Sequence, residues 1–138
     1  MIRSSTATWQ GAGFDGEGRL STKSSILFDI PFTFNSRFAD GTAGTNPEEL
    51  LAAAHASCFT MKLSFVLAEA GYVADFLETI ANINFVNGNI VGSHLIVSAK
   101  IPGISRELFN ECVTDAERNC PVSRILNVTI TIEAAIAI

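Results

Sequence analysis

A long uninterrupted helix is the strongest structural signal in this sequence. Asn46 and Pro47 mark its start, because an asparagine side chain accepts hydrogen bonds from free backbone N–H groups and proline suits the first helical position. Glu48 then places negative charge at the positive end of the helix dipole. Helix-forming residues follow to Ala70, and Gly71 is a natural stop. The stretch predicts one helix of about 25 residues, or about 37 Å.

The predicted helix is apolar around most of its circumference. Between Leu50 and Ala70, the residues that can carry charge are His55, Lys62 and Glu69. A helix of this kind is enclosed by protein or by lipid. A membrane span would place Lys62 near the bilayer centre, at a cost of about 2.5–3.5 kcal/mol. We therefore expect enclosure by protein and no membrane partner.

Composition describes a small acidic protein with an excess of apolar residues. The chain has 138 residues, of which 48% are hydrophobic, and a formal net charge of −5. The acidic balance argues against a nucleic-acid partner, and the apolar excess predicts a subunit interface. Residues 1–6 lack the apolar core of a signal peptide, so we expect a cytoplasmic protein. With no repeat and no linker, residues 1–138 are expected to form a single domain.

Three strands are predicted ahead of the long helix, over residues 2–10, 19–27 and 30–35. Glycines punctuate the segment between the first two strands. Arg37 follows the third strand at once, and further glycines lead into the helix. Arg37 is therefore expected in a connection beside the element that carries Cys58.

A hairpin, a second helix and a last strand are predicted after the long helix. Residues 77–85 and 90–101 alternate with period two around Asn87-Gly88, which is a strong hairpin signal. Ser105 can cap a helix that runs to about Arg118. The remaining elements are a short turn or helix over residues 120–126 and a strand over residues 128–132. This order predicts an α+β fold with antiparallel sheets.

Cys58 lies in the middle of the long helix. A thiol is a nucleophile only as thiolate, and it needs a nearby cation or a helix N-terminus to lower its pKa. Cys58 is too far from the start of its own helix for the dipole to act, so a cation must come from Arg37, Lys62 or His55. A lone cysteine in an apolar helix is also a common core residue. Residue type alone leaves both interpretations of Cys58 open.

The other cysteines differ in context, and the total of three fits neither a secreted disulfide framework nor a zinc site. Cys120 precedes Pro121 at the start of a turn, where we expect it to be exposed to free backbone N–H groups that favour thiolate. Cys112 lies on the apolar side of the second helix and is expected to be structural. Burial is expected for His55, and His94 has no indicated role. No metal site is expected from the histidine and cysteine spacing.

Two separated motifs resemble those of the OsmC/Ohr family of thiol peroxidases. They are Gly44-Thr45-Asn46-Pro47-Glu48-Glu49-Leu50 with Ala53-Ala54-His55-Ala56-Ser57-Cys58-Phe59, and Cys120-Pro121-Val122-Ser123. The resemblance covers nearly the whole chain, and the form with His55 is closer to the OsmC branch. It implies an OsmC-like fold, with sheets packed around the long central helix, and an intertwined homodimer.

The resemblance also implies roles for individual residues. Cys58 would be the peroxidatic cysteine and Cys120 the resolving one, with Arg37 and Glu48 as the activating pair. The implied activity is reduction of organic hydroperoxides, and more weakly of hydrogen peroxide, in oxidative and osmotic stress defence. It proceeds through a sulfenic acid on Cys58 and a Cys58–Cys120 disulfide. No bound cofactor is expected, since a lipoyl-type dithiol or a lipoylated protein would restore the thiols. Cys112 has no counterpart among these roles.

Two functions from other classes stay open. The chain could be a non-catalytic module that holds a lipid-like ligand in an apolar pocket, with incidental cysteines. It could also be a thiol redox sensor that reacts with partner proteins. Counting free thiols during titration with an organic hydroperoxide separates these classes, because a binding module consumes none.

Helix geometry predicts that the site is shared between two chains. The stretch from Glu48 to Cys58 corresponds to about 15 Å along the helix axis and about 80° around it. The Arg37 side chain reaches only about 7 Å, comparable to two residues of backbone. If two long helices cross antiparallel in a dimer, Arg37 and Glu48 of one chain approach Cys58 of the other. A kinked helix, or Glu49 as the acid, would instead allow a one-chain site.

Overall fold

The computed structural model describes residues 1–137, which fall into two compact units, residues 1–50 and residues 51–137. The first unit contains β1 (Ser5–Gln10), β2 (Glu17–Thr22), β3 (Ile30–Phe32), α1 (Phe34–Phe38) and the start of α2 (Pro47–Glu69). The second contains the rest of α2, then β4 (Phe76–Val86), β5 (Asn89–Lys100), α3 (Arg106–Asn119), α4 (Pro121–Ile125) and β6 (Thr129–Ala137).

The long helix α2 forms as its sequence predicts. The side-chain oxygen of Asn46 accepts a hydrogen bond of 2.7 Å from the backbone N–H of Glu49. Pro47 is the first helical residue, and the helix ends at Glu69 rather than at Ala70. Gly71 follows with φ 88°, a left-handed conformation that glycine adopts without steric cost. The predicted start and stop of the helix are therefore confirmed.

The second unit holds a sheet in the order β4-β5-β6. Asn87 and Gly88, both with positive φ, form the turn of the predicted β4–β5 hairpin. The α+β class is confirmed with one correction, because β6 pairs parallel to β5 rather than antiparallel. The helices α3 and α4 connect these two strands, and a helical crossover is what joins parallel neighbours. β6 also extends beyond the predicted residues 128–132, to Ala137.

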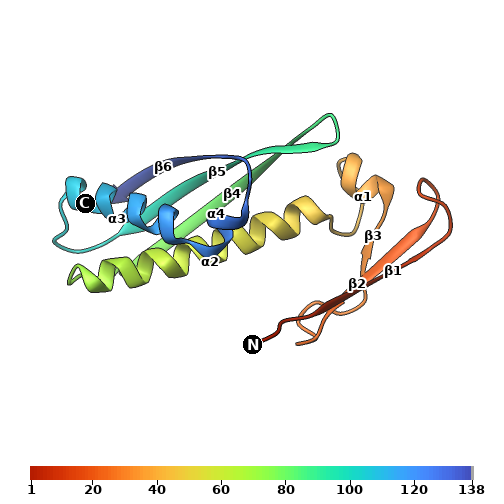
Figure 1. Ribbon diagram of the computed structural model, residues 1–138, viewed down its shortest axis with the longest axis horizontal. Helices are drawn as coiled ribbons and strands as arrows, with labels where there is room; N and C mark the ends of the chain where they lie inside the picture. Colours follow the sequence, from red (N-terminus) through yellow and green to blue (C-terminus); the bar gives the residue numbers. More distant parts are fainter. Residues whose placement is uncertain (138) are drawn as a thin grey trace. The chain divides into compact units, whose positions relative to one another are not determined.

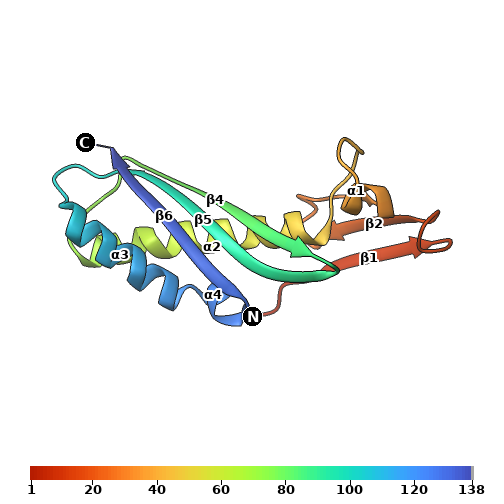
Figure 2. The same ribbon diagram turned by 90° about the horizontal axis from the view of Figure 1, so that it is seen from above.

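The core of the second unit lies between this sheet and its helices. Figures 1 and 2 show α2, α3 and α4 together on one face of the sheet. Strand side chains alternate, so every second residue of β5 from Ser93 onward faces the helices and is buried. The fully buried large side chains of this core are Phe59, Leu63, Leu67, Leu95, Val97 and Phe109. Residues 55–67 of α2 are thereby held by packing rather than by helix propensity alone.

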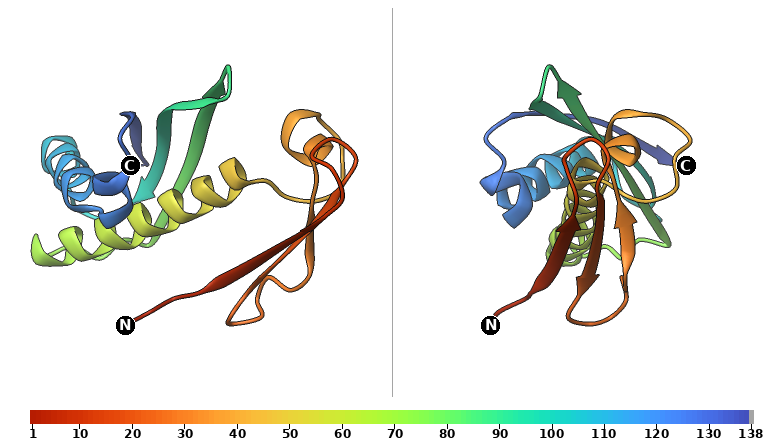
Figure 3. Two further views of the ribbon diagram at one scale, coloured as in Figure 1. Left: turned by 45° about the vertical axis from the view of Figure 1, so that its right-hand side comes forward. Right: turned by 90° about the vertical axis from the view of Figure 1, so that its right-hand side faces the viewer.

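The first unit is a three-stranded antiparallel sheet in the order β1-β2-β3, drawn in red to orange in Figure 3. Within residues 1–50, all of which the structure describes, no large apolar side chain is buried. Trp9 is 39% exposed and Phe14 is 75% exposed. A sheet of this size needs an apolar face covered by another element to be stable. The first unit therefore lacks a core of its own.

The strand predicted over residues 19–27 is shorter in the structure and ends at Thr22. The chain turns there, because Ser25 has φ 63° and its N–H donates a 2.9 Å hydrogen bond to the carbonyl of Thr22. The polar residues Lys23, Ser24 and Ser25 favour a turn at this point, and the strand prediction overlooked them.

The strand predicted over residues 30–35 ends at Phe32, because Thr33 begins the short helix α1. The Thr33 hydroxyl accepts from the Ser36 N–H at 3.0 Å, and the Ser36 hydroxyl accepts from the Thr33 N–H at 2.8 Å. This is a capping box with serine in the place of the usual Glu or Gln. Arg37 therefore lies in a helix and not in the connection that we expected.

Candidate active site

Cys58 and Cys120 meet in the second unit, although they are far apart in the sequence. Cys58 lies on α2, and Cys120 is both the C-cap of α3 and the N-cap of α4. Both are free thiols, and their side chains are hydrogen-bonded to each other. Cys120 is fully buried, whereas Cys58 is half-buried. The arrangement places one thiol that solvent can reach beside one thiol that solvent cannot reach.

The surroundings of Cys58 within this unit oppose a thiolate. Burial raises the pKa of the Cys58 thiol, and the neighbouring Cys120 raises it further. The backbone N–H of Val122 acts in the opposite direction by donating a hydrogen bond to the sulfur, but burial outweighs it. A cation is therefore needed to make Cys58 a nucleophile at neutral pH.

The prediction that Cys120 is exposed to free N–H groups is wrong. Cys120 is fully buried, and its side chain makes no capping hydrogen bond. Pro121 has no N–H, so the first donor of α4 is that of Val122, and this donor reaches Cys58 instead. The sequence correctly indicated that free N–H groups lie at the start of α4. In the tertiary structure, however, the Val122 N–H points to Cys58 and not to Cys120.

His55 is a buried polar junction in the second unit. Its side chain is 0% exposed, with Nδ1 2.7 Å from the Ser93 hydroxyl of β5 and Nε2 2.7 Å from the Ser123 hydroxyl of α4. Burial lowers the pKa of His55, so the imidazole is neutral at physiological pH. The predicted burial is confirmed, and His55 is not the cation for Cys58. Sequence reasoning missed Ser93, whose only signal is its place on the inward face of β5.

Arg37 and Glu48 form an ion pair in the first unit. Nη2 of Arg37 donates to Oε1 of the Glu48 carboxylate at 2.7 Å, and Nε donates to Oε2 at 3.2 Å. Glu48 is 9% exposed, and two parallel hydrogen bonds hold the guanidinium plane in one orientation. The Arg37 guanidinium carbon also lies 5.3 Å from the centre of the Phe38 ring. Glu49, the alternative acid, instead accepts a 2.6 Å hydrogen bond from the Thr45 hydroxyl.

An aromatic cavity of about 180 Å³ adjoins Arg37 in the first unit. Its ring-bearing lining residues are Trp9, Phe32, Phe34 and Phe38. The rings contact one another, with centroids 5.5 Å apart for Trp9–Phe32 and 4.7 Å apart for Phe34–Phe38. An apolar cavity with one cation at its wall suits a small molecule that has an apolar body and a polar end.

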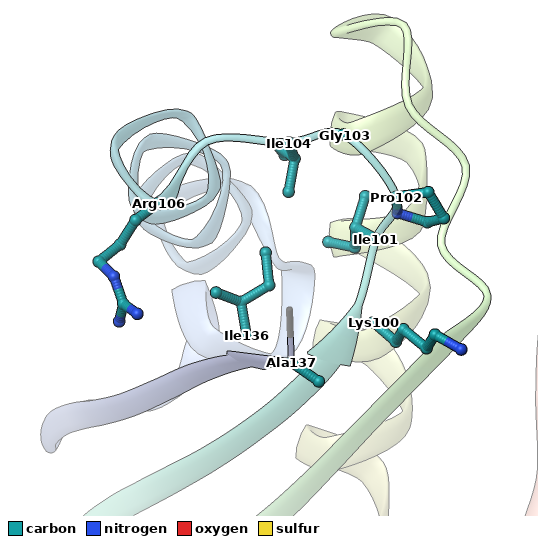
Figure 4. Close-up of a pocket in the computed structure, with 8 residues that line it drawn as sticks. All are labelled: Lys100, Ile101, Pro102, Gly103, Ile104, Arg106, Ile136 and Ala137. Carbon is teal, nitrogen blue, oxygen red and sulfur yellow. The ribbon is translucent and has the colours of Figure 1, made fainter.

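A larger cavity, of about 470 Å³, lies where β5 and β6 end in the second unit. Figure 4 shows Ile101, Ile104 and Ile136 around it, with Lys100 and Arg106 on opposite sides. The cavity lining contains none of the cysteines and neither residue of the ion pair. Size alone does not associate this cavity with the thiol chemistry.

Two observations on the described residues concern metal binding and membrane insertion. In residues 1–137, no group of three or more His, Cys, Asp or Glu side chains is placed to hold a metal ion. In the same residues, α2 is the one helix long and apolar enough to cross a membrane by length and composition. Phe59, Leu63 and Leu67 on this helix are fully buried in the second unit, as in the core helix of a globular protein.

The fold and the thiol pair define a class: an α+β protein whose long helix carries a half-buried free cysteine beside a buried free cysteine. The family model for OsmC-like proteins matches residues 39–134 of this chain. The chain is 38% identical to peroxiredoxin OsmC of Escherichia coli (strain K12) over 131 residues, or 92% of this chain and 91% of that protein. This chain belongs to the OsmC family, as its motifs predict.

Relatives of the second branch also match. The organic hydroperoxide resistance protein OhrB of Bacillus subtilis is 30% identical over 112 residues, or 78% of this chain and 79% of that protein. Its crystal structure gives a TM-score of 0.71 at 28% identity, covering 96% and 98% of the two chains. An OsmC-like protein from Mycoplasma pneumoniae shares the fold, with a TM-score of 0.77 at 14% identity and coverage of 100% and 99%. The predicted OsmC-like fold is thus confirmed.

Proposed function

We propose that this protein is a cysteine-based peroxidase that reduces organic hydroperoxides, and more weakly hydrogen peroxide, to alcohol or water. The observation that carries the proposal is the hydrogen-bonded pair of Cys58 and Cys120, one accessible and one buried. The relationship to a peroxiredoxin and to an organic hydroperoxide resistance protein supports it. The proposed setting is oxidative and osmotic stress defence in the cytoplasm, where thiols are kept reduced.

The reaction begins at Cys58. Its thiolate attacks one oxygen of the hydroperoxide, so a sulfur–oxygen bond forms, the oxygen–oxygen bond breaks and the departing alkoxide takes a proton. Cys58 is then a sulfenic acid. The Cys120 thiol attacks the oxidised sulfur, a disulfide forms and the sulfenic oxygen leaves as water. Because the two thiols are already hydrogen-bond partners, this second step needs little movement.

In this proposal Arg37 supplies the cation that lowers the pKa of Cys58. A guanidinium fork can stabilise the thiolate and also donate to the peroxide oxygen on which charge develops. Glu48 holds the guanidinium plane through two hydrogen bonds, so the fork is oriented before substrate arrives. In this proposal Cys58, Cys120, Arg37 and Glu48 are the catalytic set.

The aromatic cavity beside Arg37 supports the preference for organic hydroperoxides. Each methylene group buried there would favour binding by about 0.8 kcal/mol relative to water, and hydrogen peroxide offers none. The cation on the cavity wall would hold the polar peroxide end of the substrate.

An external dithiol of the lipoyl type, free or on a lipoylated protein, is the proposed reductant. Its thiolate attacks the Cys58 sulfur of the disulfide, because Cys120 is fully buried, and Cys120 leaves as the thiol. The second thiol of the same reductant then displaces Cys58 and leaves as a cyclic disulfide. A dithiol completes this exchange without any cofactor bound to the protein.

We also propose that the working unit is a homodimer with intertwined chains. The face of α2 opposite the core is exposed and carries no charge: Ala54, Ser57, Met61, Ser64, Phe65 and Ala68. Met61 is 63% exposed and Phe65 is 59% exposed. An uncharged stripe of this kind, together with a first unit that lacks a core, supports an interface between subunits.

The proposed dimer shares its sites between chains. α2 is continuous, so the stretch from Glu48 to Cys58 corresponds to about 15 Å of helix axis. Arg37 is held by Glu48, which leaves it little reach along the helix. Arg37 and Glu48 of one chain would therefore serve Cys58 of the other. The family match spans the boundary between the two compact units, which supports a single OsmC-like domain over residues 1–138.

Titration of the reduced protein with tert-butyl hydroperoxide tests the function. We expect each equivalent of peroxide to remove about two thiols and to yield the alcohol, as sulfenic acid formation and condensation require. Mass analysis should locate the new disulfide at Cys58 and Cys120. An unchanged thiol count in folded protein would instead support the ligand-binding module, and oxidation only through partner proteins would support the redox sensor.

Mixing two inactive variants tests the shared site. Cys58→Ser and Arg37→Ala subunits, mixed in equal amounts and allowed to exchange, should recover about a quarter of wild-type activity. About half of the dimers are then heterodimers, and each heterodimer rebuilds one of its two sites. The matched control mixes Cys58→Ser with Cys120→Ser. Those two cysteines lie in the same unit of one chain, so no intact pair is rebuilt and turnover should not rise above that of the separate variants. No recovery in the first mixture, with subunit exchange verified, would rule out sharing.

A further inference from the structure

The short helix α4 is attached to α2 at two neighbouring points. It has five residues, beginning directly after Cys120. The Val122 N–H donates to the Cys58 sulfur, and the Ser123 hydroxyl lies 2.7 Å from His55 Nε2. His55 and Cys58 are three positions apart on α2 and share one face of that helix. A helix this short has no stability of its own, so such contacts determine where Cys120 lies.

His55 extends this attachment into the sheet. Its Nδ1 is 2.7 Å from the hydroxyl of Ser93 on β5, so one ring links three elements. A neutral imidazole donates at one nitrogen and accepts at the other, and a serine hydroxyl can complement either. The ring and Ser93 are 0% and 1% exposed, and Ser123 is 6% exposed. Buried hydrogen bonds of this kind are costly to leave unpaired, so the junction is held in one geometry.

We propose that His55 is a positioning residue for the disulfide step, because its bridge from Ser93 to Ser123 holds α4, and Cys120 with it, against α2. The inference rests on the peroxidase function proposed above and assigns a role that the catalytic set does not include. His55 touches neither substrate nor a reacting atom in this role.

The chemistry explains why the position of Cys120 matters. The sulfenic acid on Cys58 has two competing fates. Attack by Cys120 forms the disulfide and releases water. Reaction with a second hydroperoxide forms another sulfur–oxygen bond, breaks the oxygen–oxygen bond and releases alcohol, leaving a sulfinic acid that thiols do not reduce. A Cys120 held in contact with Cys58 favours the first fate, since proximity raises its effective concentration.

Two matched substitutions of His55 test its hydrogen bond to Ser93 and its hydrogen bond to Ser123 separately. In His55→Asn the amide occupies the place of Nδ1 and can reach only Ser93. In His55→Gln the amide extends to the place of Nε2 and can reach Ser123. We expect His55→Asn to raise the ratio of sulfinic acid to disulfide on Cys58 about fivefold, corresponding to about 1 kcal/mol for one lost hydrogen bond. His55→Gln should stay within about twofold of wild type.

Serine variants repeat the comparison with a smaller change. Ser123→Ala removes one hydroxyl and should behave as His55→Asn, whereas Ser93→Ala should behave as His55→Gln. The measurement is mass analysis of Cys58 after a fixed excess of tert-butyl hydroperoxide, with circular dichroism to verify folding. The rate at which Cys58 reacts with the first peroxide should change little. A general structural defect would instead change this rate together with the ratio of sulfinic acid to disulfide.

The results test the positioning role of His55 and the proposed peroxidase function separately. An unchanged ratio in folded Ser123→Ala overturns the positioning role, as does an equal shift in all four variants, which would indicate general loosening. If the wild-type protein itself forms no disulfide between Cys58 and Cys120, the proposed function fails. A wild-type disulfide with an unshifted ratio in the variants leaves the function standing and removes only the role of His55.

Discussion

Replacing Cys58 with serine is expected to abolish hydroperoxide consumption, to the level of the buffer alone. A serine hydroxyl does not ionise near neutral pH and cannot replace the thiolate. The remaining thiols are poorly placed to substitute for it, since Cys112 is 4% exposed and Cys120 is 0% exposed. The measurement is peroxide remaining over time, with excess dithiol present.

The other two cysteines provide the matched comparison. Cys120→Ser should consume about one equivalent of peroxide in the absence of added thiol and leave a sulfenic acid on Cys58, detectable by mass. Cys112→Ala should keep its activity and lose about 1 kcal/mol of stability from core packing. Burial raises the pKa of the Cys112 thiol, and the negative charges of Asp115 and Glu111 raise it further, so Cys112 stays protonated. A folded but inactive Cys112→Ala would contradict the assigned roles.

Arg37→Ala is expected to slow the first step about 100-fold at neutral pH, the usual effect of removing one preorganised donor from developing negative charge. The pH dependence gives a sharper prediction. Burial and Cys120 already raise the pKa of Cys58, and loss of the cation removes the opposing influence. The thiolate fraction then develops only at higher pH. The loss of rate should therefore be largest at neutral pH and shrink as the pH rises.

Two further variants test the geometry of this ion pair. Arg37→Lys keeps the charge but loses the planar fork, so its rate should fall between those of wild type and Arg37→Ala. Glu48→Gln removes the charge that holds the guanidinium and should lose less than Arg37→Ala. The measurement is the alkylation rate of Cys58 across pH. An Arg37→Ala profile that matches wild type would identify Lys62 as the cation, because His55 is neutral.

Local chemistry determined the elements that the sequence predicted well. Asn46 and Pro47 start α2, and Asn87 with Gly88 turns the β4–β5 hairpin, because each needs only its immediate neighbours to act. The short helix α1 escaped prediction for a related reason. Its capping box uses Ser36 where the common signal has Glu or Gln, so the local pattern was present but unusual. The sequence also pointed to Cys58 and Cys120, because each lies within a short contiguous motif.

Only the tertiary structure decided what surrounds those cysteines. Cys120 and Val122 come from a segment remote in sequence, and the fold buries the first and turns the N–H of the second toward Cys58. The hydrogen bonds of His55 likewise join residues on three separate elements. Sequence patterns report local backbone preference and burial, whereas a hydrogen bond between distant side chains depends on how the elements pack. The sequence could therefore point to Cys58 as the candidate nucleophile, but it could not predict the surroundings of that thiol.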